Sequence, residues 1–196
     1  MYSAAQSTKK REELLMNKKI RWITETAILL ALLVSLQYIT KPMGQLVTGS
    51  CVNAILAIAA LVGGLSSGLT IALVSPVLAF LLGIAPQILT VPAIMAGNSV
   101  YVVLLHLLAD QTGKNLGKQI AAWLLASVAK FAALYFIVVK LICGVLAESL
   151  LAAGTLKAPM LKALPATFSW PQLITALIGG AIALAIVPAL RKALRK

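Results

Sequence analysis

Charged side chains are scarce in this chain of 196 residues. Asp, Glu, Lys and Arg make up 11% of it and hydrophobic residues make up 61%, whereas a soluble domain carries about 25% charged residues. This composition leaves too little charge for a globular surface in water, so we predict an all-α integral membrane protein. At about 20 residues a span, the apolar stretches hold five or six helices. They leave no room for a soluble catalytic or nucleotide-binding domain.

The residues of hydrolytic and metal-dependent chemistry are rarer still. The chain has five Asp and Glu residues, a single histidine at position 106 and two cysteines, Cys51 and Cys143. A metal site within a membrane needs a cluster of these side chains, and a nucleotide site of the GxxxxGK[ST] type is missing. We therefore expect neither an enzyme nor a metal or other cofactor. His106 is expected to be a packing residue that can hydrogen-bond Asp110, and both cysteines are expected to be free thiols.

Positive charge is the one kind in excess, with a formal net charge of +12. The basic residues gather at the ends of apolar runs, which is typical of topology signals and of contact with lipid head groups rather than of a nucleic-acid surface. We predict a basic, partly disordered cytoplasmic tail over residues 1–21, a six-span membrane domain over 22–190 and a second basic cytoplasmic tail over 191–196.

Glycine and proline divide the apolar sequence into spans, because both residues interrupt helices. The predicted spans are residues 22–40, 51–63, 68–84, 88–108, 120–147 and 170–190, with a first loop over 41–50 and a longer connection over 148–169. Six spans put twelve Lys and Arg residues on the cytoplasmic side and three outside, whereas five spans give eight and seven. The positive-inside rule favours six spans in a compact bundle with both termini cytoplasmic.

Polar residues inside the apolar runs predict a pocket. They fall mostly in the half of the membrane that faces outward, and polar side chains in lipid usually face a bundle interior or a wet cavity. Hydrogen bonds between helices or anchoring at the interface remain the alternative for each residue alone. The candidate substrate-binding residues are Gln37, Asn53, Gln87, Asn98, Tyr101, Lys130, Lys140, Trp170 and Gln172.

Two of these candidates are lysines within the fifth predicted span. Lys130 lies about 15 Å deeper than Lys140, and an ionisable group at that depth suggests a functional site. Pairing with a backbone carbonyl or an inward water path is an equal alternative. Lys140 either reaches the head groups along its apolar stem or binds an anionic group of a ligand.

A stripe of small residues runs along the first span at every fourth position: Ala27, Ala31 and Ser35. In lipid, helices associate largely through close backbone contact at small residues. The stripe is therefore a candidate docking face for a partner helix, although packing inside the same chain would produce the same spacing.

Residues 21–191 resemble an S component of an energy-coupling factor (ECF) transporter. The similarity rests on the AILLA segment at 27–31 and on the segments VTGSCVNAILAIAALVGGLSSG and PQILTVPAIMAGNSVYVVLLHLL. The resemblance implies a bacterial plasma-membrane subunit that captures a vitamin-like small-molecule substrate at the outer face.

The same resemblance implies that this subunit topples in the bilayer and that its partners are one membrane coupling subunit and two ATPase subunits. It assigns docking to Ala27 and Ala31 and a lid to the first loop. No signature of a particular vitamin is present. The rival hypothesis is a structural scaffold of the MreD type, which needs neither a pocket nor buried lysines.

Overall fold

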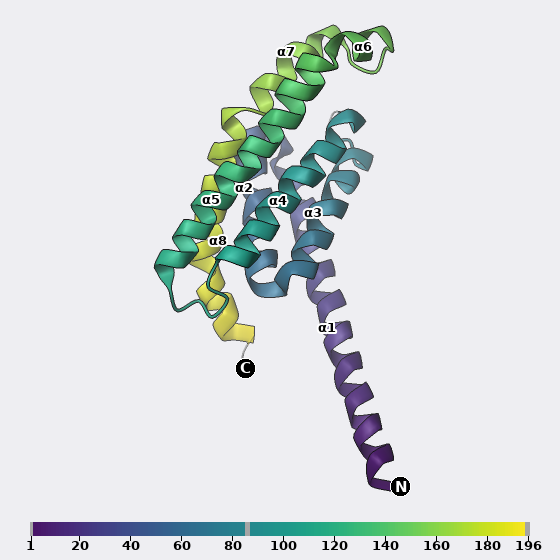
Figure 1. The fold of residues 1–196 in the computed structure, drawn as a ribbon, viewed down its shortest axis with the longest axis vertical. Helices are drawn as coiled ribbons and strands as arrows, with labels where there is room; N and C mark the ends of the chain where they lie inside the picture. The colour runs from purple at the N-terminus through teal and green to yellow at the C-terminus, as the bar shows by residue number, and fades with distance from the viewer. Residues whose placement is uncertain (1, 85–86, 195–196) are drawn as a thin grey trace.

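The protein is a bundle of helices (Figure 1). The computed structural model describes the backbone of residues 2–84 and 87–194 and the side chains from residue 16 onward, and within these residues there is no β-strand. Five helical stretches of this part of the chain are long and apolar enough to cross a membrane, at Met16–Met43, Gln45–Leu81, Ile88–Leu108, Leu116–Val145 and Ala158–Leu194. The prediction of an all-α membrane bundle is confirmed.

Eight α-helices make up most of these stretches. Their bounds are α1 Tyr2–Thr40, α2 Gln45–Ile58, α3 Gly64–Leu81, α4 Val91–Leu108, α5 Leu116–Leu134, α6 Ala147–Ala152, α7 Ala158–Thr167 and α8 Trp170–Leu194. Short π-helical segments continue α2 through Ala59–Gly63 and α5 through Tyr135–Val145, and 3₁₀ turns occupy Lys41–Met43 and Ile88–Thr90.

The stretch Gln45–Leu81 reverses direction in its middle. Gly64 has a φ of +85°, a conformation that favours glycine. A Cβ atom on Gly68 would lie 3.3 Å from the Cα atom of Ala60, although eight residues of straight helix would separate them by about 12 Å. Helices α2 and α3 therefore form a helical hairpin, visible in Figure 1 as the turn at the lower end of the bundle. The reversal occurs at Gly63 and Gly64, which are the first two residues of the break that the sequence predicts over 63–68.

Helix α2 is the centre of the bundle. Its second half is buried on every face from Asn53 to Ile58, and α1, α3, α4 and α8 all pack on it. Close contact with α8 depends on glycine: a Cβ atom on Gly179 would lie 2.5 Å from the Ser50 carbonyl oxygen. Such backbone approach is how helices gain packing energy in lipid.

Two connections are more helical than the sequence predicted. Helix α2 begins at Gln45, so only Lys41–Gly44 separates it from α1, and the expected loop over 41–50 is wrong in its second half. The expected connection over 148–169 contains α6 and α7. Pro159 in the first turn of α7 is compatible with a helix start, because its missing N–H has no helical partner there.

Two further predictions are wrong, one at the N-terminal end of α1 and one at the C-terminal end of α4. Helix α1 already begins at Tyr2, so the tail is helical rather than partly disordered. His106 does not bond Asp110; its Nδ1 lies 3.1 Å from the Ala60 carbonyl oxygen. Hydrogen bonds from the backbone amide of Asn115 and from Thr112 instead lower the pKa of Asp110 to about 2. Cys51 and Cys143 are free thiols, as expected.

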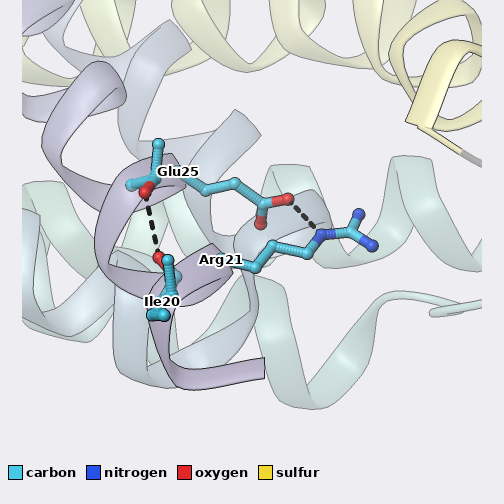
Figure 2. Close-up of polar contacts among 4 residues, drawn as sticks. Ile20, Arg21 and Glu25 are labelled. Atoms are coloured by element: carbon cyan, nitrogen blue, oxygen red, sulfur yellow. Dashed lines mark hydrogen bonds and ion pairs between the residues drawn. The ribbon is translucent and has the colours of Figure 1, made fainter. Parts of the chain in front are cut away.

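Helix α1 carries an acidic residue where it joins the bundle. Glu25 accepts a hydrogen bond from Arg21 one turn earlier, with Nε 2.7 Å from Oε1, and Figure 2 shows the two side chains pointing toward each other. The Thr24 hydroxyl donates to the Ile20 carbonyl in the same turn. The charge of Glu25 is therefore satisfied within α1.

The contact between α2 and α8 predicts a sharp difference between two glycines. Gly179→Ala should lower the melting temperature in detergent, because the new methyl group meets the backbone of Ser50, and such overpacking costs about 1–3 kcal/mol. Gly144→Ala is the control: its nearest atom would lie 3.5 Å away, so it should melt at or above the temperature of the wild type. Equal melting temperatures of the two variants would contradict this account of the packing.

Candidate functional site

A cavity of about 310 Å³ lies among the helices. It is lined by α1, α2, α3, α4, α5, α7 and α8 and by the turn before α4. Its volume is at the lower end of the range of small-molecule sites. The lining residues are Gln37, Gln45, Thr48, Gly49, Val52, Asn53, Ser75, Pro76, Ala79, Ile84, Gln87, Thr90, Ile94, Asn98, Lys130, Leu134, Met160, Ala163, Leu164, Thr167, Phe168 and Gln172.

The structure brings six of the nine candidate residues to this cavity, although they come from six separate parts of the chain. They are Gln37, Asn53, Gln87, Asn98, Lys130 and Gln172.

The other three candidates lie outside the cavity lining. Tyr101 is fully buried beside it, and its hydroxyl donates to the Ala176 carbonyl at 3.3 Å. Lys140 is exposed, with its Nζ 5.7 Å from the centre of the Tyr135 ring. Trp170 is 67% exposed and stacks on Phe131, which is the position of an interface anchor.

Lys130 is the polar centre of the cavity wall. Its ammonium group donates to Asn53 Oδ1 at 2.5 Å and to Asn98 Oδ1 at 2.7 Å, and it lies 5.5 Å from the centre of the Tyr101 ring. The side chain is 2% exposed. Helices α2, α4 and α5 thus meet at one buried cation. Side-chain amides bind it, and not the backbone carbonyl that the sequence analysis gave as an alternative partner.

Asn53 extends this contact to α8. Its Nδ2 donates to the Gly49 carbonyl at 2.9 Å and to Thr175 Oγ1 at 3.3 Å. Thr175 in turn donates to the Gln172 carbonyl. The orientation of the Asn53 oxygen toward Lys130 is therefore fixed by partners on two helices.

Several buried polar atoms of the cavity wall have no partner in the described part of the chain. They are the amide nitrogen of Asn98 and the side-chain oxygens of Gln37 and Gln87. Buried polar groups without a partner cost free energy, so they are uncommon in proteins unless a bound molecule satisfies them. Their presence around one cavity indicates a ligand site.

Helix α7 covers one side of the cavity. Met160, Leu164 and Phe168 line it, and the Gln87 side-chain amide contacts the Met160 sulfur. Sequence reasoning missed this helix because it treated residues 148–169 as a connection. The spacing of these three apolar residues by four is the signal that would have placed them on one helix face.

The small-residue stripe lies elsewhere. Ala27, Ala31 and Ser35 are exposed on α1, whereas Thr26 and Leu33 on the opposite face are buried. Thr26 joins α1 to α3 by donating to Ser67 Oγ at 2.9 Å. The stripe therefore takes no part in the internal packing of the chain.

The hydrogen bonds of Asn53 predict a difference in stability between two cavity residues. Asn53→Leu should lower the melting temperature of the ligand-free protein, because it deprives Lys130 of a hydrogen bond to a charged group, worth about 1.5–3 kcal/mol. Gln37→Met is the control, since the Gln37 oxygen has no partner to lose. Thermal unfolding in detergent measures both, and a loss of stability in the control equal to that of Asn53→Leu would contradict the assignment.

Comparison with known proteins agrees with this architecture. Residues 21–191 match the model of the family described as the ECF transporter, substrate-specific component. Neither a curated protein nor a solved structure matches the chain. Members of this family are substrate-binding transport subunits, not enzymes. The matched region covers every residue that lines the cavity, and on this evidence the chain belongs to the family of ECF transporter substrate-specific components.

Proposed function

We propose that this protein captures a vitamin-like micronutrient at the outer face of the bacterial plasma membrane and delivers it inward. In this proposal a membrane coupling subunit and two ATPase subunits supply the energy, and the chain itself supplies the binding site. The observation that carries the proposal is the cavity at Lys130, where unpartnered buried polar atoms face a space of about 310 Å³. A scaffold of the MreD type has no need of such a cavity.

The proposal requires six spans with both termini in the cytoplasm. The reversal at Gly64 supports it, because it divides Gln45–Leu81 into two antiparallel passes. Helix α1 begins and α8 ends at the same end of the bundle, where the α4–α5 connection also lies (Figure 1). Lys114 belongs to this connection and Lys118 to the first turn of α5. At the other end, the Lys41 ammonium donates to the Gly83 carbonyl. This distribution of basic residues follows the positive-inside rule.

Cysteine labelling tests this topology. In a background without Cys51 and Cys143, a cysteine at Lys157 should react with an impermeant maleimide added to intact cells, and a cysteine at Lys114 should react only after the membrane is opened. The physical reason is that the six-span arrangement puts the two positions on opposite sides of the bilayer. Equal labelling of both positions from outside would exclude the six-span topology.

The exposed stripe on α1 is the proposed contact with the coupling subunit. Ala27, Ala31 and Ser35 lie away from the bundle, so a partner helix can approach their backbone without displacing internal contacts. Exposed Ile28 and Leu32 flank the stripe and would add apolar packing to the same contact. Small residues bordered by larger apolar ones are typical of interfaces between membrane helices.

The double variant Ala27→Leu with Ala31→Leu tests docking and binding separately. It should lose ATPase co-purification from its native membranes, because two bulky side chains hold the partner helix away. It should still retain a small molecule in native mass spectrometry, as the wild type should. The control Val128→Leu enlarges an exposed side chain on α5 and should change neither property. Retention of no small molecule by the wild type would favour the scaffold, and continued ATPase association of the double variant would remove the stripe from the docking site.

A further inference from the structure

Lys130 is a buried cation whose partners are all neutral. Two amide oxygens and an aromatic ring surround its ammonium group. An ammonium group has three protons to donate, and the amides accept two of them. Because Lys130 lines the cavity, the remaining proton is available to a ligand there.

No acidic side chain of the described residues balances this charge. The one ion pair among them joins Arg21 to Glu25 (Figure 2). Asp110 accepts hydrogen bonds within its own loop, and Glu148 is exposed on α6.

The two remaining acids, Glu12 and Glu13, belong to the far end of α1. Glu13 precedes the cavity residue Gln37 by roughly 36 Å of helix. A charge buried in a membrane protein usually pairs with another charge or with backbone carbonyls, and no acidic side chain of the described residues pairs with Lys130.

A second unpartnered donor lies beside the ammonium group. The oxygen of the Asn98 amide accepts from Lys130, so the nitrogen of the same amide is adjacent to Lys130 Nζ. That nitrogen is buried and has no partner, and Asn98 is 1% exposed. One cationic donor and one neutral donor therefore stand side by side at the cavity wall.

We propose that this pair binds the carboxylate group of the transported substrate, one oxygen on Lys130 and the other on Asn98. The inference rests on the proposed function and adds the chemical class of the substrate. A carboxylate matches the arrangement because it has a single negative charge and two oxygens that can accept in parallel. A phosphate group carries close to two charges and three oxygens, and the cavity offers one cation.

The rest of the cavity sets the shape of the substrate. Its walls include several apolar side chains, among them Val52, Ile94, Leu134 and Phe168. Gln37, near the end of α1, and Gln87, just before the 3₁₀ turn that leads into α4, each have an unpartnered oxygen that can accept a hydrogen bond. The substrate is therefore a compact monocarboxylate with an apolar body and an N–H or O–H group remote from the carboxylate.

Matched acids and amides test the inference on the full chain in lipid nanodiscs. Hexanoate and 3-phenylpropionate are the probes, each compared with its primary amide, and the melting temperature is the readout because a bound ligand stabilises the folded state. The acids should raise the melting temperature of the wild type and the amides should not. Lys130→Met should weaken acid binding by roughly 10- to 100-fold, the usual effect of losing a hydrogen bond to a charged group.

Two further variants complete the test. Lys140→Met is the control, since it removes a lysine of the same helical stretch that lies outside the cavity, and it should bind the acids as the wild type does. Asn98→Asp supplies a carboxylate from the chain itself. It should therefore abolish the acid-dependent shift without lowering the melting temperature of the free protein. This variant tests the carboxylate assignment even if Lys130→Met fails to fold.

The outcomes separate this inference from the proposed function. Acids and amides that stabilise the wild type equally, or an acid shift that survives in Lys130→Met, would overturn the carboxylate assignment and leave a substrate-binding subunit. Failure of every probe, together with a neutral molecule retained in native mass spectrometry, would do the same. Failure of every probe with no retained molecule would overturn both.

Discussion

The bundle depends on contacts that hold helices together where water is absent. Hydrophobic burial does not favour helix association in lipid, so close backbone packing and buried polar contacts replace it. Both are found on α2, which packs on α8 through Gly179 and whose Asn53 side-chain oxygen accepts a hydrogen bond from Lys130. Asn98 brings α4 to the same ammonium group. One buried cation thus joins three helices, and the glycine contact fixes the fourth against them.

This arrangement relates the stability of the protein to its ligand. A packed, fully satisfied core would leave no polar atom for a substrate. Here the amide nitrogen of Asn98 and the oxygens of Gln37 and Gln87 are buried without partners, and each such group costs about 1–3 kcal/mol in a folded protein. A substrate that satisfies them recovers this free energy on binding. The ligand-free bundle is therefore less stable than its packing alone would allow, and specificity follows from which groups remain to be satisfied.

The sequence predicts the helices better than it predicts the site, for physical reasons. Long apolar runs and glycine breaks locate the spans, because membrane helices need length and apolarity and little else. The burial cost of polar groups brings six cavity residues into the candidate set. Depth in the span favours Lys130 but leaves Lys140 in the candidate set, since the direction of each side chain depends on neighbours far away in the sequence. Helix α7 escapes prediction because its prolines, Pro159 and Pro165, resemble those of a loop, although Met160, Leu164 and Phe168 share one face.

Helix α1 belongs to both surfaces on which the proposed function depends. Gln37 lines the cavity, and Ser35, two residues earlier, ends the exposed stripe. Residues two apart on a helix point about 200° away from each other, so the two faces share one rigid backbone without sharing a side chain. Any movement of α1 that accompanies closure of the cavity around a substrate therefore also moves the stripe. Thr26 and Leu33 hold α1 against the bundle on the same side as Gln37. The stripe therefore stays on the outer side of the helix that lines the cavity, and a partner docked on it would contact that helix directly.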